Sequence, residues 1–208
     1  MIYVVSGPRR SGTSMMMRAL YEGGIPAIYQ PDLEELNPRG DYTANPGGLY
    51  EVGQGYYLNA KFLREIPDDS VIKIMFDGLA SLPFRDYKII FMERDPEEIQ
   101  ASLERMDSHL SQHDIKPTAD WPAPFNCFRP YKQEDINHVL DICEARLDMH
   151  LIRVNFRKVL RHPKYELGSL NLLGVPINVD KAAAVVNPKL YRTRQGNQNV
   201  KHSQGRSI

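Results

Sequence analysis

The chain has 208 residues, and at about 150 residues per domain this length favours one well-filled domain over two large ones. Hydrophobic residues make up 42% of the chain and charged residues 25%, which is typical of a globular protein and excludes a disordered chain, collagen and a coiled coil. The 26 basic residues balance 26 acidic ones, so no overall positive field attracts a nucleic acid or an anionic membrane. Any anion site must therefore be local.

The sequence carries no signal for export or for membrane insertion. No stretch approaches the roughly 18 consecutive apolar residues that span a bilayer, and residues 1–6 have no basic region or cleavage site. We therefore expect a cytoplasmic protein. Cys127 and Cys143 lie too far apart for a C-x-x-C metal or redox pair, so we expect both thiols to be reduced and inert.

The first half of the chain begins with a strand, a loop and a helix. Residues 1–6 form an apolar, β-branched run that predicts a buried parallel strand, and Gly7 and Gly12 bound a tight loop before apolar residues recur at helical spacing. Residues 30–55 are rich in Pro, Gly and Asn, which predicts a long loop that covers a site. Beyond it we expect a helix at 54–65, strands at 71–76 and 88–92, and a helix that begins at Asp95-Pro96 and ends near Met106.

The second half opens with a proline-rich segment. Four prolines prevent regular structure over most of residues 107–130, so we expect a second lid there. Apolar spacing then predicts a helix at 134–150, a strand at 151–154 and short helices at 167–173 and 179–186. We expect a single domain over residues 1–196 and a flexible polar tail over 197–208.

Strands that alternate with helices predict an α/β fold of three layers. Its sheet is mostly parallel with helices on both faces, as in proteins with a phosphate-binding P-loop, and ligands bind at the carboxyl ends of the strands. The loop that begins at Gly7 lies at such an end.

Residues 7–14, Gly-Pro-Arg-Arg-Ser-Gly-Thr-Ser, match the phosphate-binding pattern G-x-x-x-x-G-x-[ST] between a strand and a helix. Glycines let the backbone approach a ligand, and successive N–H groups with the helix N-terminus attract an anion. The alternative is an ordinary strand-to-helix turn, but two arginines and three hydroxyls favour an anion. A nucleoside-triphosphate site would carry Lys where this chain has Thr13, which weakens a kinase interpretation.

The segment Arg10-Ser11-Gly12-Thr13-Ser14 resembles the 5′-phosphosulfate loop of the sulfotransferase family, P-[KR]-S-G-T-[ST], and the pattern is nearest to bacterial sulfotransferases. Arg9 stands where the family has proline. The family binds the 3′-phosphate of its donor through an Arg at a strand end and a Ser eight residues later, and Arg94 and Ser102 reproduce this spacing. The structural alternative is an exposed Arg94 that caps Asp95 or Glu98, with Ser102 on a solvated face.

A third, shorter match lies near the C-terminus. Arg194-Gln195-Gly196 resembles the Arg-Lys-Gly segment with which the family closes on the 3′-phosphate, and Arg192 competes for the same role. The resemblance spans about residues 2–105 and 151–196. It assigns donor binding to Arg9, Ser11, Gly12, Thr13, Ser14, Arg94, Ser102 and Arg194.

The resemblance implies transfer of a sulfuryl group from 3′-phosphoadenosine 5′-phosphosulfate to an acceptor hydroxyl or amine, without a metal. Arg10 would stabilise charge on the leaving phosphate, and Lys73 lies where many family members place a catalytic Lys. A strand-edge lysine that extends to solvent is the alternative for Lys73. Met75 stands where the cytosolic enzymes have their catalytic His, so the base must come from elsewhere.

Glu51 is the leading candidate for that base. Residues 45–51, Asn-Pro-Gly-Gly-Leu-Tyr-Glu, resemble the N-P-x-G-x-x-E stretch of sulfotransferases that use a Glu base, and a covered site would raise the pKa of such a carboxyl. A Glu at a helix N-terminus is the structural alternative. His109 and His113, in the second predicted lid, are rival bases.

Two other functions stay open from the sequence alone. One is a P-loop kinase for a small molecule, and the other is a non-catalytic nucleotide-binding protein that has lost its base. The acceptor, a small molecule, carbohydrate or peptide, and the oligomeric state do not follow from the sequence.

Overall fold

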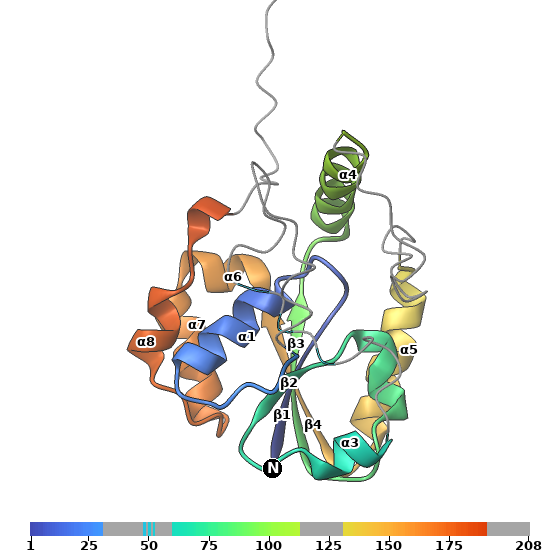
Figure 1. Ribbon diagram of the computed structural model, residues 1–208, viewed down its shortest axis with the longest axis vertical. Helices are drawn as coiled ribbons and strands as arrows, with labels where there is room; N and C mark the ends of the chain where they lie inside the picture. Colours follow the sequence, from blue (N-terminus) through green and yellow to red (C-terminus); the bar gives the residue numbers. More distant parts are fainter. Residues whose placement is uncertain (31–47, 49, 51, 53–59, 113–130, 191–208) are drawn as a thin grey trace, which may run out of the picture.

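The computed structural model of the chain describes residues 1–30, 48, 50, 52, 60–112 and 131–190. Its centre is a parallel sheet of four strands in the order β2-β1-β3-β4 (Figure 1). The strands are β1 (Ile2–Ser6), β2 (Val71–Lys73), β3 (Tyr87–Glu93) and β4 (Met149–Asn155). This arrangement confirms the predicted parallel α/β fold.

Helices cover both faces of the sheet and make three layers (Figure 1). One face carries α1 (Thr13–Glu22), α6 (Phe156–Arg161), α7 (Pro163–Leu172) and α8 (Val179–Ala184). The other carries α3 (Ala60–Glu65), the 3-10 helix η1 (Phe76–Ser81) and α5 (Gln133–Ala145). Helix α4 (Pro96–Gln112) rises beyond the carboxyl end of β3, and a short 3-10 turn, η3 (Pro188–Leu190), ends the described part.

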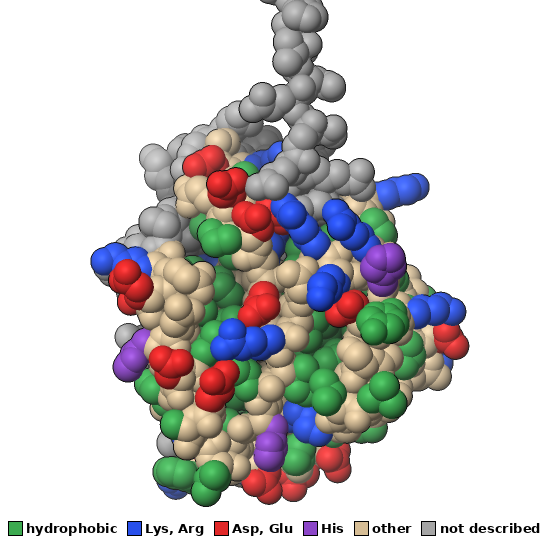
Figure 2. Space-filling view, turned by 180° about the vertical axis from the view of Figure 1, so that it is seen from behind, with side chains coloured by type: hydrophobic (Ala, Val, Ile, Leu, Met, Phe, Trp, Pro, Cys, Tyr) green, Lys and Arg blue, Asp and Glu red, His purple; other side chains and the backbone are tan. Residues whose placement is uncertain are grey.

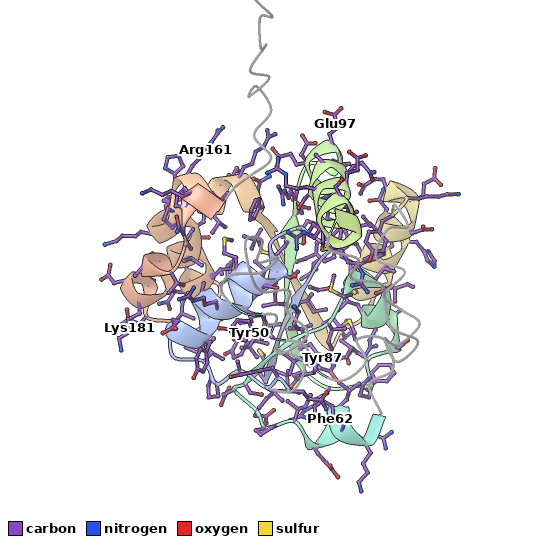
Figure 3. All side chains as sticks on the ribbon, turned by 45° about the horizontal axis from the view of Figure 1, so that its top comes forward. Tyr50, Phe62, Tyr87, Glu97, Arg161 and Lys181 are labelled. Carbon is purple, nitrogen blue, oxygen red and sulfur yellow. The ribbon has the colours of Figure 1, made fainter. Side chains whose placement is uncertain are left out.

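Strand β1 lies inside the sheet, between β2 and β3, and every one of its residues is buried. Side chains alternate along a strand, so Tyr3 and Val5 enter the core beneath α1 while Ile2 and Val4 enter the core beneath α5. The same alternation places Tyr87 of β3 deep in the α5-side core, whereas Arg161 and Lys181 lie on helices at the surface (Figure 3).

The chain order of the strands sets where a ligand can bind. After β1 the chain adds β2 on one side of β1, and it then adds β3 and β4 on the other side of β1. The direction in which strands are added to the sheet therefore changes between β1 and β3. Crevices at the carboxyl ends of two such strands are the usual ligand sites of open parallel sheets. The loop after Ser6 and the residues after Glu93 both lie at this crevice.

Several predicted boundaries were wrong. The strand predicted at 71–76 ends at Lys73 because Phe76 begins η1, and the helix predicted at 134–150 ends at Ala145, before β4 begins at Met149. Helix α4 continues to Gln112, into the lid predicted at 107–130, because the nearest helix-breaking proline is Pro117. Helix α6 was not predicted at all.

Other predictions lie outside the described residues. These are most of both predicted lids, at 30–55 and 107–130, and the tail at 197–208. In the described ranges, none of the helices combines the length and the apolar character that a membrane span requires.

Candidate functional site

The loop between β1 and α1 keeps its shape because glycine occupies two positions that no larger residue tolerates. Gly7 has φ +144°, and a Cβ there would lie 2.6 Å from the carbonyl oxygen of Met92. Gly12 has φ +101°, and a Cβ there would collide with the ring of Phe156. The Ser11 amide donates to the Pro8 carbonyl at 3.1 Å and closes the turn. The backbone therefore packs tightly against β3 and α6.

The loop presents hydrogen-bond donors to an anion. No side chain caps the N-terminus of α1, so the amides of its first turn, at Thr13 and Ser14, have no acceptor within the helix. Arg10 adopts φ 65°, the left-handed conformation that turns successive amides toward one side. In the described part of the chain, the hydroxyl of Ser11 is fully buried and has no hydrogen-bond partner. An oxyanion seated in the loop would supply the missing acceptor.

Lys73 brings an ammonium group to this loop. It is the last residue of β2 and lies beside Val5 of β1, and its residue surface is only 3% exposed. Its Nζ donates a hydrogen bond to Oγ of Ser14 at 3.2 Å. Lys73 therefore does not extend to solvent as a strand-edge lysine would. A buried ammonium is costly unless an anion or several acceptors compensate it.

Arg94 and Ser102 lie directly against the loop. Nε of Arg10 donates to Oγ of Ser102 at 3.0 Å, and Nη1 of Arg94 donates to the backbone carbonyl of Arg10 at 2.6 Å. Ser102 is buried, which excludes a solvated face for it. The tertiary structure thus brings Arg10 together with two residues that lie 84 and 92 positions later in the chain.

Arg94 pairs with Glu98, as the structural alternative stated, but its side chain is 7% exposed and not on the surface. Phe156 and Arg157, which were not predicted from the sequence, complete its surroundings. Nε of Arg94 donates to Oε2 of Glu98 at 3.2 Å, and its guanidinium lies 4.6 Å above the ring of Phe156. The other oxygen of Glu98 accepts a hydrogen bond from Nε of Arg157 at 2.6 Å. One sequence feature could have indicated Phe156 and Arg157. They directly follow the strand β4, and Arg94 directly follows the neighbouring parallel strand β3, so all three residues leave the sheet at the same edge.

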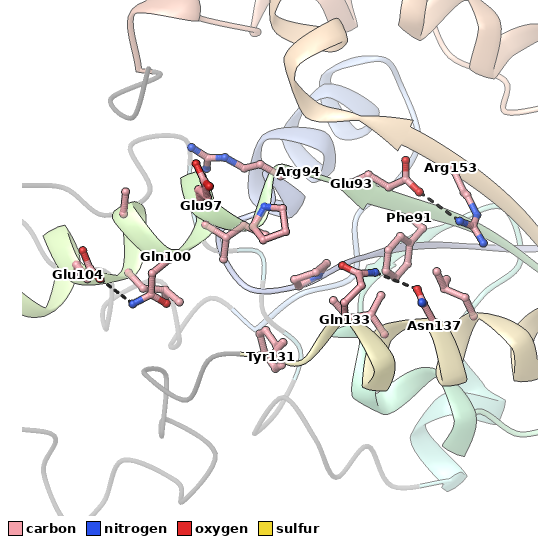
Figure 4. Close-up of a pocket in the computed structure, with 17 residues that line it drawn as sticks. Phe91, Glu93, Arg94, Glu97, Gln100, Glu104, Tyr131, Gln133, Asn137 and Arg153 are labelled. Carbon is pink, nitrogen blue, oxygen red and sulfur yellow. Dashed lines mark hydrogen bonds and ion pairs between the residues drawn. The ribbon is translucent and has the colours of Figure 1, made fainter. Parts of the chain in front are cut away.

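A cavity of about 610 Å³ lies between α4 and α5, next to the loop (Figure 4). Pro8 of the loop and Phe91 of β3 line it, together with Leu103 of α4 and Ile136 of α5. Polar groups such as Asn137 stand around these apolar side chains (Figure 4). Its size and its mixture of an apolar lining with a few polar groups suit a small organic molecule.

Figure 2 shows acidic and basic side chains intermixed on one face, without a large area of one sign.

Within residues 1–30, 60–112 and 131–190, no three His, Cys, Asp or Glu side chains are grouped as a metal site. Burial raises the pKa of the Cys143 thiol to about 11, so this thiol is protonated at neutral pH, as expected for an inert cysteine.

Other predicted site residues lie outside the described part. These are Glu51, His113 and Arg194, and with them Cys127 and Arg192; the side chain of His109, in α4, is likewise not described. Arg9 is described and lies half-buried in the loop. The roles of all these residues stay predictions.

Comparison with known proteins yields distant structural resemblances. No family model matches the chain, and no curated protein sequence matches it. A structure of retinol dehydratase in complex with androsterone and the inactive cofactor PAP matches with 12% identity and a TM-score of 0.45, over 89% of this chain and 63% of that one. A sugar kinase from Janibacter sp. HTCC2649 matches with 16% identity and a TM-score of 0.35, over 89% and 98% of the two chains.

The chain thus spans less than two thirds of the retinol dehydratase chain. At these levels of similarity, no chemistry of either protein transfers to this chain. The protein has an α/β fold. Its glycine-bounded loop, the buried Lys73 and the pair of Arg10 and Arg94 meet at the carboxyl edge of a parallel sheet.

Proposed function

We propose that this protein is a sulfotransferase, which moves a sulfuryl group from 3′-phosphoadenosine 5′-phosphosulfate to an acceptor hydroxyl or amine. The observation that carries the proposal is the contact of Arg10 with Ser102 and of Arg94 with the Arg10 carbonyl. A donor with phosphates at both ends of one ribose needs two adjoining anion sites. The loop and the start of α4 are adjacent in this way.

The donor would bind by its two anionic groups. The 5′-phosphosulfate would accept hydrogen bonds from the loop amides, from the Ser11 hydroxyl and from Thr13 and Ser14. The 3′-phosphate would lie near Arg94 and Ser102. Arg9 and Arg194 are further candidates for contacts with the donor.

Sulfuryl transfer requires charge stabilisation and a base. The acceptor oxygen or nitrogen forms a bond to sulfur while the bond from sulfur to the phosphate oxygen breaks, and the electron pair of that bond leaves with the phosphate. Arg10 and Lys73 would stabilise the negative charge that develops there. A carboxylate or imidazole takes the acceptor proton, and Glu51, His109 and His113 are the candidates.

A kinase is the second candidate, and the environment of Ser14 argues against it. In a P-loop kinase, the hydroxyl at this position binds Mg²⁺. Here the same hydroxyl accepts a hydrogen bond from the Lys73 ammonium. A positive charge at that oxygen repels a divalent cation, so the local electrostatics disfavour Mg²⁺ and favour a donor without a metal.

The acceptor would occupy the cavity between α4 and α5, because Pro8 of the loop forms part of its wall. We expect Asn137→Trp, which places an indole in the cavity, to raise the acceptor KM at least tenfold without changing donor affinity. An unchanged acceptor KM would place the acceptor elsewhere.

Calorimetric titration with adenosine 3′,5′-bisphosphate, the product of the donor, tests the proposed function. We expect binding in the micromolar range that does not require Mg²⁺. No binding at about 100 μM, or an equal preference for ATP with Mg²⁺, would refute the sulfotransferase. Donor binding without turnover on a broad acceptor panel, unaffected by Glu51→Gln, would indicate a non-catalytic nucleotide-binding protein.

Two arginine variants then separate the roles of the two anion sites. We expect Arg10→Ala mainly to lower kcat, because its charge acts on the leaving phosphate, and Arg94→Ala mainly to raise the donor KM. A reversal of these two effects would show that the phosphates are misassigned.

A further inference from the structure

A buried carboxylate lies between two arginines beside the loop. The side chain of Glu98 is 1% exposed, and its two oxygens accept hydrogen bonds from different guanidinium groups. Oε2 pairs with Arg94 of the β3–α4 junction, and Oε1 pairs with Nε and Nη2 of Arg157 in α6. Such a carboxylate fixes the positions of both arginines, because any movement would leave a buried charge uncompensated.

The fold explains why Arg157 reaches this place. Strands β3 and β4 pair in parallel with Glu93 beside Asn155, so the residues that follow them leave the sheet at the same edge. Phe156 then packs beneath the guanidinium of Arg94 and against the position of Gly12. This packing brings Arg157, the next residue, to Oε1 of Glu98, whereas Arg94 contacts Oε2.

The two arginines differ in their access to solvent. The side chain of Arg94 is 7% exposed, and it is tied to Glu98, to the Arg10 carbonyl and to the Phe156 ring. The side chain of Arg157 is 33% exposed, although Asp95 also approaches its Nη2 at 3.7 Å. An anion arriving from solvent therefore meets Arg157 more readily than Arg94.

The charges of this cluster favour a dianion. The contacts described above involve three guanidinium groups, those of Arg94, Arg157 and Arg10, and two carboxylates, those of Glu98 and Asp95. A phosphate monoester with two negative charges suits a pair of guanidinium groups, because arginine forms parallel hydrogen bonds to phosphate oxygens.

We propose that Arg157 is a second binding arginine of the nucleotide's 3′-phosphate site and that Glu98 is the positioning residue that holds it beside Arg94. This inference rests on the proposed function and extends it, since no sequence motif assigned either residue. The ligand group is a ribose 3′-phosphate monoester. The 5′ group binds in the loop and does not depend on Glu98.

The experiment compares two nucleotides that differ only in the 3′-phosphate, adenosine 3′,5′-bisphosphate and adenosine 5′-monophosphate. Their dissociation constants are measured by calorimetry for the wild type, Glu98→Gln, Arg157→Gln and the control Arg161→Gln. Arg161 lies one turn after Arg157 on α6 and is exposed at the surface (Figure 3). Thermal melting of each variant monitors folding.

We expect Arg157→Gln and Glu98→Gln each to weaken bisphosphate binding about tenfold or more, while monophosphate binding stays within about threefold. Arg161→Gln leaves both constants unchanged. The result for Glu98 is diagnostic, because removing a negative charge near an anion would strengthen binding of both nucleotides if the charge acted only through space. A merely structural role would weaken both nucleotides equally.

The outcomes separate this inference from the proposed function. If the wild type binds neither nucleotide, the proposed function fails and the inference fails with it. If the wild type prefers the bisphosphate and Arg157→Gln keeps that preference, only the inference is overturned. Should Glu98→Gln not fold, Arg157→Gln decides alone, because the Glu98 carboxylate keeps its pairing with Arg94 in that variant.

Discussion

Replacement of Lys73 by Met separates a functional lysine from a structural one. Met has a similar length and volume but no charge, so it fills the space at the end of β2 without an ammonium group. In the structure, Lys73 is almost fully buried, and its Nζ donates a hydrogen bond to Oγ of Ser14 in the loop between β1 and α1. If this ammonium serves a bound phosphate, the variant loses ligand affinity and keeps its stability.

The magnitudes follow from the burial. A charge-assisted hydrogen bond to a phosphate contributes about 1.5–3 kcal/mol, so we expect adenosine 3′,5′-bisphosphate to bind roughly 10–150-fold more weakly. Burying an ammonium group costs free energy, and Met at this position removes that cost together with the hydrogen bond to Ser14, so the two changes in stability oppose each other. In a chain of about 200 residues, each kcal/mol shifts Tm by about 2–4 °C. We therefore expect a nearly unchanged Tm in Lys73→Met.

Lys88 offers a control on strand β3 of the same sheet, which is separated from β2 by β1. Its Nζ donates to the carbonyls of Leu173 and Gly174 at 2.8 and 3.0 Å, which fastens the turn after α7. Lys88→Met should therefore lower Tm and leave the bisphosphate dissociation constant unchanged. Calorimetry and thermal melting measure both quantities for both variants. A lower Tm for Lys73→Met with a dissociation constant within twofold of the wild type would refute the functional assignment.

Two further predictions concern stability. We expect Gly12→Ala to lower the free energy of unfolding, measured in urea, by more than about 2 kcal/mol, because φ +101° is strained for alanine and the new Cβ collides with Phe156. The control Gly168→Ala lies in α7 with open space around the new Cβ, so we expect it to raise the free energy of unfolding by up to about 1 kcal/mol. Equal effects of the two substitutions would contradict this prediction. Arg146 lowers the pKa of Asp148 to about 2, below its ordinary value of 3.8. Between these two pH values the unfolded chain binds more protons than the folded one, so the stabilisation is present above about pH 4 and is lost as the pH falls toward 2. Asp148→Asn should thus be less stable than the wild type at pH 6, with the difference shrinking toward pH 2, whereas Asp180→Asn, in an exposed pair, shows little difference at either pH.

The sequence alone determined the features that depend on neighbouring residues. The apolar run at 1–6, the glycines at 7 and 12 and the apolar spacing after them lie within about 20 residues. Local propensity and backbone sterics were therefore sufficient to predict a strand, a tight loop and a helix. The parallel α/β fold followed from the alternation of such elements. The end of β2 at Lys73 was harder to predict, because packing rather than local preference ends this strand.

Tertiary structure alone decided which charged groups meet. Arg94 and Ser102 were predicted as a pair, but the contact of both with Arg10 depends on the pairing of β1 with β3, which joins residues over 80 positions apart. The arrangement of Arg157 and Glu98 depends in the same way on the pairing of β3 with β4. A motif records spacing along the chain, whereas strand register determines distance across the sheet. For that reason the sequence revealed the loop, and only the fold revealed the arginines that surround it.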